Sequence, residues 1–259
     1  MEQHATEWLN YQALILNIWN KLQQIRKFVI ITKKGAYFMR KGFTLSELLL
    51  SLVIIGVVAT LTVPVLLNNV HNKTFVSQIK NMSATIEQLA QDELIAHRTR
   101  DLSDTDFGDP EKLLSDKHFF IAKSCTSDES LTKCWKTNAT GKDKIQYKFL
   151  NRQNMGINVG GRTIVLKNGV MFRYSEPTGD EKTSGDVVCK ILMDVNGNDK
   201  PNIVGRDLFG FYITNKGKVV DRSYAAKSND SLSTKINNCK TNVWYCYGAL
   251  ADNGWKMDY

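Results

Sequence analysis

The sequence predicts an α+β protein, in which one long N-terminal helix packs on a C-terminal head domain built around an antiparallel β-sheet. Residues 43–67 form an apolar run with a single charge, which predicts a helix that is buried on all sides. Residues 68–100 continue with an apolar stripe at helical spacing. The C-terminal half then contains short β-prone segments separated by turn residues. A helix followed by antiparallel strands is typical of the α+β class.

The first half of the helix is apolar enough to cross a membrane. The 25 residues from Phe43 to Leu67 contain no Lys, Arg or Asp, and Glu47 is their one charged side chain. About 20 apolar residues cross a bilayer as a helix, so we expect residues 43–67 to span the membrane. A carboxylate inside such a segment is costly, which makes Glu47 a candidate functional residue.

The basic residues of the chain are concentrated before this segment. Residues 1–42 hold seven Lys and Arg against two Asp and Glu, a net charge of +5, which leaves +3 of the total +8 for the rest of the chain. This distribution predicts that the leader side stays in the cytoplasm and that the head domain lies outside. A basic total that comes from one terminal segment is weak evidence for nucleic-acid binding, and we expect no specific nucleic-acid partner.

The second half of the helix, residues 68–100, has one apolar face and one polar face. It is therefore expected to pack beneath the head domain, residues 101–259. One helix from Thr44 to about Ala96 would be about 80 Å long, and Pro64 should bend or locally unwind it. The apolar stripe consists of Phe75, Ile79, Met82, Ile86 and Leu89.

The head domain is expected to begin with a polar loop and to continue with strands. Residues 101–140 predict a loop with a short helix from Glu111 to Phe120. Asn168-Gly169 and the turn from Asn215 to Gly217 each separate two apolar runs, and Asn-Gly in that setting is a strong hairpin signal. The expected strands are Ile145–Leu150, Met155–Val159, Thr163–Leu166, Val170–Tyr174, Val187–Val195, Leu208–Thr214 and Lys218–Asp221.

All five cysteines lie in the head domain. An extracytoplasmic domain is in an oxidising compartment, so disulfide bonds are expected. The simplest local pairs are Cys125 with Cys134 and Cys239 with Cys246, which leave Cys189 over, although sequence spacing does not fix the connectivity. The cysteines and the four histidines show no metal-ligand spacing.

The densest group of oxygen-bearing side chains lies between residues 194 and 207. Its acidic and amide side chains alternate as at the opening of a calcium-binding loop. The segment departs from an EF-hand because Asp199 and Gly205 replace the glycine and the glutamate of that motif. An Asx-rich turn that holds no ion explains the same residues and is the preferred interpretation. The chain is expected to require no cofactor, and calcium is a possible one. Under the calcium hypothesis the ligands are Asp194, Asn196, Asn198 and Asp207.

Four aromatic residues crowd the C-terminus. We expect them to pack against the sheet rather than to bind a sugar or a partner, because Trp and Tyr contribute strongly to burial in small domains. These residues are Trp244, Tyr245, Tyr247 and Trp255.

The chain is not expected to be an enzyme. It has no GxSxG, HExxH, Walker or GxGxxG motif, and no histidine stands at triad spacing from a nucleophile and a carboxylate.

The sequence Gly-Phe-Thr-Leu-Ser-Glu at residues 42–47, after Arg40 and Lys41, resembles the type III signal of type IV pilins and type II secretion pseudopilins. The resemblance implies that a prepilin peptidase cuts after Gly42 and methylates the new terminal Phe43. Residues 1–42 would then be removed, either as a long leader or as an extension upstream of an alternative start at Met39. Pro64 also falls where many pilins have a helix-kinking proline.

The resemblance further implies a structural subunit of a type IV pilus-like filament or of a type II secretion pseudopilus, and it leaves this choice open. It implies that the Glu47 carboxylate pairs with the Phe43 amine of a neighbouring subunit. Some major pseudopilins hold calcium in a C-terminal loop, which gives the calcium hypothesis a precedent. The alternative is a signal-anchored extracytoplasmic binding protein.

The implied partners are other copies of the chain or related subunits, the prepilin peptidase, an inner-membrane platform protein, an assembly ATPase and membrane lipid. The subunit is expected in the cytoplasmic membrane as a single-pass protein with its head domain outside, and afterwards in an extracytoplasmic filament.

Overall fold

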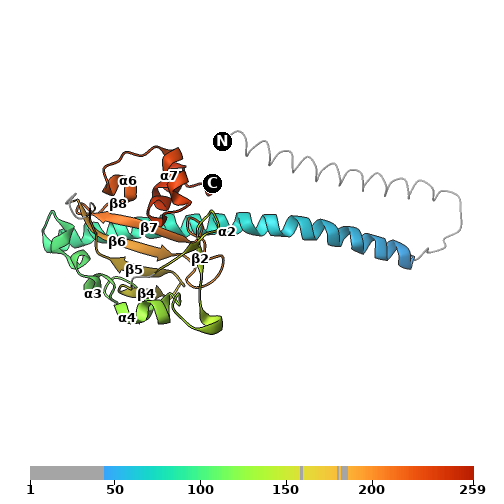
Figure 1. Ribbon diagram of the computed structural model, residues 1–259, viewed down its shortest axis with the longest axis horizontal. Helices are drawn as coiled ribbons and strands as arrows, with labels where there is room; N and C mark the ends of the chain where they lie inside the picture. Colours follow the sequence, from blue (N-terminus) through green and yellow to red (C-terminus); the bar gives the residue numbers. More distant parts are fainter. Residues whose placement is uncertain (1–43, 158–159, 180, 182–185) are drawn as a thin grey trace. The chain divides into compact units, whose positions relative to one another are not determined.

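The computed structural model describes residues 44–157, 160–179, 181 and 186–259 (Figure 1). Gly42, Phe43 and the leader lie outside the described residues, as do residues 158–159 of one expected strand. The chain divides into two compact units, Met1–Leu61 and Thr62–Tyr259, and each is described by itself.

The long helix α2 runs from Leu45 to His97, 53 residues, and agrees with the expected helix to within one residue at each end. We expected Pro64 to bend or locally unwind the helix; helical structure continues through Pro64, so the helix is not unwound there. α2 stops at a sharp turn, because Arg98 takes a positive φ of 51° and the Thr99 N–H bonds back to the Leu94 carbonyl at 3.1 Å. This turn directs the following segment back along the last turns of the helix.

The main sheet of the second unit has six strands in the order β1-β4-β5-β6-β7-β8, and all neighbours are antiparallel. β2 and β3 form a separate two-stranded sheet. The strands are β1 (Ile121–Cys125), β2 (Tyr147–Lys148), β3 (Asn154–Met155), β4 (Thr163–Leu166), β5 (Met171–Ser175), β6 (Val187–Asp194), β7 (Leu208–Thr214) and β8 (Val219–Val220).

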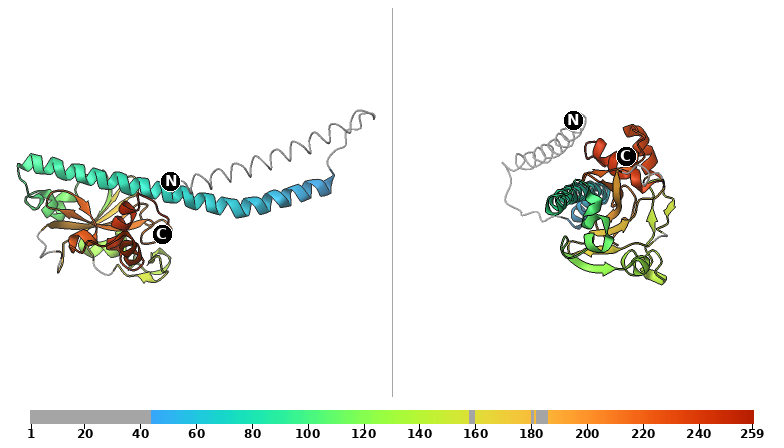
Figure 2. Two further views of the ribbon diagram at one scale, coloured as in Figure 1. Left: turned by 90° about the horizontal axis from the view of Figure 1, so that it is seen from above. Right: turned by 90° about the vertical axis from the view of Figure 1, so that its left-hand side faces the viewer.

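The C-terminal half of α2 lies along one face of the sheet (Figure 2). Phe75, Ile79 and Ile86 of the predicted stripe are buried, whereas Met82 and Leu89 are only partly buried. Ile86 lines a small apolar space together with Ile191 of β6 and Ile213 of β7, so the helix stripe and the sheet form one core. The α+β fold class is therefore confirmed.

The other face of β7 is covered by the C-terminal segments. A Cβ on Gly210 would lie 2.5 Å from the ring of Trp244, and the Tyr212 and Trp244 rings are 5.3 Å apart. On the helix side of the sheet, Tyr247 packs against Phe211 at 5.6 Å. The aromatic residues of the C-terminus thus pack on the sheet, as expected.

The boundaries of several elements differ from the expectation. The helix expected from Glu111 to Phe120 is the short α3 (Pro110–Leu113), because Leu113 and Leu114 turn into the core at its end. Residues 101–140 are not a loop throughout, since they include β1 on the sheet edge.

Short helical elements complete the second unit, and none of these was expected. They are η1 (Leu102–Asp104), η2 (Asp106–Gly108), α4 (Ser127–Glu129), η3 (Ser130–Cys134), η4 (Gly141–Asp143), α6 (Arg222–Ala225), α7 (Leu232–Cys239), η5 (Val243–Tyr245) and α8 (Cys246–Asp252).

Candidate functional site

The start of α2 is closed by a reciprocal pair of hydrogen bonds between Thr44 and Glu47. The Thr44 backbone N–H donates to Glu47 Oε2 at 2.9 Å, and the Glu47 N–H donates to the Thr44 hydroxyl oxygen at 3.3 Å. The Thr44 hydroxyl also donates to Glu47 Oε2 at 2.9 Å. This is a capping box, which satisfies backbone donors that a helix N-terminus otherwise leaves unpaired.

The position of Glu47 also suits its charge. A carboxylate in the first turn of a helix interacts favourably with the positive end of the helix dipole. Glu47 is exposed within the described chain, so a further cation can approach it. Its expected partner, the amine of Phe43, lies outside the described residues, and that pairing remains a prediction.

The first helical turns present apolar side chains on every side. The large side chains of this unit are about half exposed or more in the single chain, from Leu45 at 79% to Leu48 at 49%. A helix that is apolar all round is normally covered by protein or by lipid. The exposed apolar side chains are Leu45, Leu48, Leu49, Leu50, Leu52, Val53, Ile54, Ile55, Val57 and Val58.

No helix within the described residues is long and apolar enough to cross a membrane.

A second candidate site lies in the long β6–β7 connection. Asp194 ends β6 and is paired in register with Leu208, so the preceding residue, Asp207, is placed next to Asp194. Both carboxylates are fully buried. Asp207 accepts backbone hydrogen bonds from Asn202 and Ile203, each at 2.6 Å.

Asp194 is held by donors from two places in the chain. Its Oδ1 accepts from the Asn196 N–H at 3.0 Å, and its Oδ2 accepts from the Tyr147 hydroxyl at 2.6 Å. Tyr147 belongs to β2, and no sequence signal linked it to this loop. The structure therefore brings Asp194 and Asp207 together as expected and adds Tyr147.

Burial and mutual repulsion make it unfavourable for the two carboxylates to be charged together. Burial, followed by the nearby Asp207 charge, raises the pKa of Asp194 well above its ordinary value. Burial raises the pKa of Asp207 to about 6, although the backbone donors at Ile203 and Asn202 partly offset it. A cation at this loop would remove the penalty of keeping both groups ionised.

The amide side chains of the same loop leave acceptors unused. Asn196 donates to the carbonyls of Asp199 and Lys200, and Asn198 donates to the Cys134 carbonyl. The Oδ1 atoms of Asn196, Asn198 and Asn202 are buried and accept no hydrogen bond from the described residues. Buried polar atoms are normally paired, so these three oxygens are available to a water molecule or to a cation. The calcium hypothesis stays a prediction. Asn202 was not among the expected ligands.

The expected disulfides are confirmed. Cys125 is bonded to Cys134, and Cys239 is bonded to Cys246. Within the described residues Cys189 is unpaired and buried in the sheet.

The comparison with known protein families agrees with the position of the N-terminal site. The model of the prokaryotic N-terminal methylation motif matches residues 38–63. This range contains Gly42 and Phe43, at the expected cleavage position, and the Thr44–Glu47 capping box. No curated protein and no solved structure shows a significant match to the chain.

Proposed function

We propose that this chain, whose N-terminal segment carries the methylation motif of type IV pilins and type II secretion pseudopilins, is a structural subunit of an extracytoplasmic filament. The observation that carries the proposal is the match over residues 38–63, where the motif leads directly into α2. The filament is a type IV pilus or a secretion pseudopilus. Its other partners would be a platform protein and an assembly ATPase.

The proposed cycle begins with the leader in the cytoplasm and the apolar half of α2 in the membrane. The run of 25 residues without Lys, Arg or Asp supports this location. A prepilin peptidase would cut after Gly42 and methylate Phe43. Release of the leader exposes an amine close to Glu47, and methylation keeps its positive charge.

Assembly would move the apolar half of α2 from lipid into a bundle of equivalent helices. Both surroundings are apolar, so the move brings little hydrophobic gain, and specific polar contacts must then fix the register. A carboxylate buried in such a bundle requires a compensating cation. The Phe43 amine of a neighbouring subunit would provide it for Glu47.

The proposal is tested by a leader-cleavage experiment in cells that contain a prepilin peptidase. Gly42→Val is expected to retain the leader and to yield no filaments, because the side chain blocks the cleavage position. Gly35→Val, an upstream glycine substitution, is the matched control and should be processed like the wild type. Equal processing of the two variants would argue against the proposal and for a signal-anchored binding protein.

We also propose that the β6–β7 connection binds calcium through Asp194, Asn196, Asn198 and Asp207, with Asn202 as a further ligand. The three unpaired amide oxygens and the two buried carboxylates support this site. The proposal does not depend on filament assembly.

Calorimetric titration of the full-length protein with calcium tests the site. Asp207→Asn is expected to weaken binding by at least about tenfold, because it removes one of the two charges that hold the ion. Asp199→Asn, an exposed residue of the same loop, should bind like the wild type. No calcium binding by the wild-type protein would refute the site and would leave the Asx-rich turn as the explanation.

A further inference from the structure

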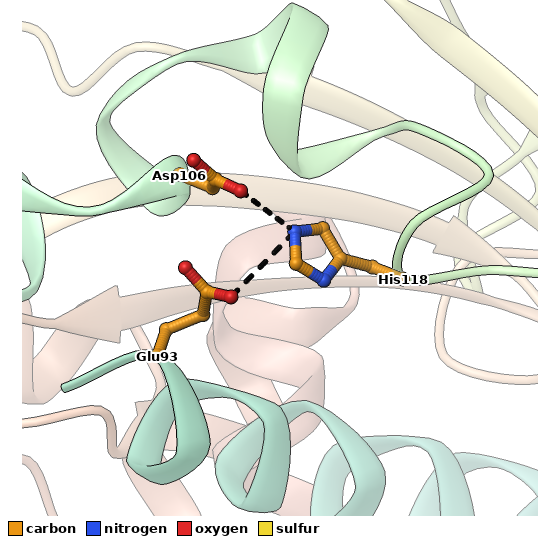
Figure 3. A group of neighbouring side chains, drawn as sticks. All are labelled: Glu93, Asp106 and His118. Atoms are coloured by element: carbon orange, nitrogen blue, oxygen red, sulfur yellow. Dashed lines mark hydrogen bonds and ion pairs between the residues drawn. The ribbon is translucent and has the colours of Figure 1, made fainter. Parts of the chain in front are cut away.

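Three side chains that could bind a metal meet at the last turns of α2. Glu93 comes from α2, Asp106 from η2 and His118 from the segment before β1 (Figure 3). His118 Nε2 lies 3.1 Å from Asp106 Oδ2 and 3.9 Å from Glu93 Oε1. One ligand atom from each residue lies within 4.8 Å of the other two. The helix stop at Arg98 makes this meeting possible because it returns the chain over Glu93.

The three side chains are largely removed from solvent. His118 is 3% exposed, Glu93 is 6% exposed and Asp106 is 14% exposed. Oε2 of Glu93 is buried and accepts no hydrogen bond from the described residues, although His97 Nδ1 lies 3.3 Å away. A buried carboxylate oxygen without a donor is costly. Glu93 therefore keeps ligand capacity beyond Oε1, the oxygen that faces His118.

Lys117 lies over the same oxygens. Its ammonium is 3.0 Å from Glu93 Oε1 and 2.5 Å from Asp106 Oδ2. The Lys117 side chain is 57% exposed, so it can move into water without breaking a packed interface. A single ammonium offsets only one of the two carboxylate charges, which leaves a net negative site.

We propose that Glu93, Asp106 and His118 bind a divalent transition metal ion, Zn²⁺, whose entry displaces the Lys117 ammonium into solvent. Imidazole nitrogen selects zinc and related ions over calcium and magnesium, and carboxylates complete such sites. A tetrahedral ion with bonds of about 2.1 Å holds its ligand atoms roughly 3.4 Å apart. The two distances from His118 Nε2, 3.1 and 3.9 Å, lie on either side of that value. Water would complete the coordination.

Metal binding requires one proton to move. In the structure His118 Nε2–H donates to Asp106 Oδ2 at 3.1 Å. His118 must present an unprotonated Nε2 to the metal, so this hydrogen shifts to Nδ1 of the neutral ring, or a proton is released to water when the ring is charged. Lys117 leaves as an ammonium, and both carboxylates remain ionised. The bound ion would join α2, η2 and the segment before β1. It would stabilise the folded head domain by an amount that grows with the logarithm of the zinc concentration once that concentration exceeds the Kd.

Titration of full-length, untagged protein with Zn²⁺, followed by calorimetry, tests the proposal. Visible absorption of the Co²⁺-loaded protein reports separately on the coordination. One tight site is expected in the wild type. His118→Gln should weaken Zn²⁺ binding by about tenfold or more and abolish the Co²⁺ spectrum. His71→Gln, outside the cluster, and Asp207→Asn, in the β6–β7 connection, should leave both readouts unchanged.

Lys117→Met gives a second test that does not disturb a buried residue. It removes the competing ammonium, so Zn²⁺ should bind several-fold more tightly than to the wild type. Unchanged or weaker binding by Lys117→Met would overturn the proposal. Wild-type binding by His118→Gln would also overturn it, because the metal would then be held elsewhere in the chain.

Discussion

The carboxylate of Glu47 accepts a 2.9 Å hydrogen bond from the backbone N–H of Thr44 and closes the start of α2. In the proposed filament, the same carboxylate pairs with the Phe43 amine of another subunit. Glu47 therefore has a role within its own helix and a proposed role between subunits. The two roles differ in what they require: capping needs an acceptor oxygen, whereas pairing with an amine needs a charge.

Substitutions at residue 47 separate these roles. Glu47→Gln keeps an acceptor for the Thr44 N–H but removes the charge, and we expect it to insert in the membrane yet to form no filaments. Glu47→Ala should fail in the same way. Thr44→Ala weakens the cap by about 1 kcal/mol but keeps the charge, so it should still assemble. The measurement is the amount of subunit in a sheared filament fraction relative to the membrane fraction. Normal filaments from Glu47→Gln would contradict the charge-pairing role.

The raised pKa of Asp207, about 6, predicts how stability depends on pH without calcium. A carboxyl group with a raised pKa in the folded state binds protons more tightly when folded, so its contribution is present at low pH and is lost as pH rises through about 6. The free energy of unfolding should therefore increase as pH falls from about 7.5 to about 5, by on the order of 1–3 kcal/mol. Glu181 acts in the opposite sense, but its pKa is lowered to about 2, so its contribution is lost only in more acidic solution.

Urea unfolding of the full-length protein at several pH values, in calcium-free buffer, checks this prediction. Asp207→Asn should flatten the pH dependence, while Asp199→Asn should retain it. Saturating calcium should stabilise the wild type at neutral pH more than it stabilises Asp207→Asn. A wild-type stability that does not change between these pH values would show that the buried pair is not protonated in this range.

Gly210 is expected to tolerate no side chain, because a Cβ there would lie 2.5 Å from the ring of Trp244. Gly210→Ala should destabilise the head domain by about 1–3 kcal/mol. In a Trp244→Ala background, Gly210→Ala should lower the free energy of unfolding by clearly less, because the ring that the new Cβ would contact is absent. A double-mutant cycle of unfolding free energies measures this difference. Equal destabilisation by Gly210→Ala in the two backgrounds would show that the clash with the Trp244 ring is not its cause.

Elements with a strong local pattern were predictable from the sequence. α2 has a long apolar periodicity, and β4 and β7 are apolar runs next to clear turns, so their bounds were predicted to within one residue. β1 was missed because three of its five side chains are exposed on the sheet edge, where no apolar pattern is required. The C-terminal helices are short and depend on packing and on the Cys239–Cys246 bond.

The candidate sites were predictable only where their residues are close in sequence. Thr44 and Glu47 are three residues apart, and most of the β6–β7 connection is one segment. Tyr147 reaches Asp194 across 47 residues, and Lys117 reaches Glu93 across 24. Contacts of this kind depend on the folded sheet and on the turn after α2, so no spacing in the sequence indicates them.

The mass of the N-terminal peptide, from protein isolated from the filament fraction of cells with a prepilin peptidase, is the most direct test of the filament role. The expected peptide begins at Phe43 and is heavier than its sequence by one methyl group. A peptide that begins at Met1 or Met39, in protein that forms no polymer, would contradict that role.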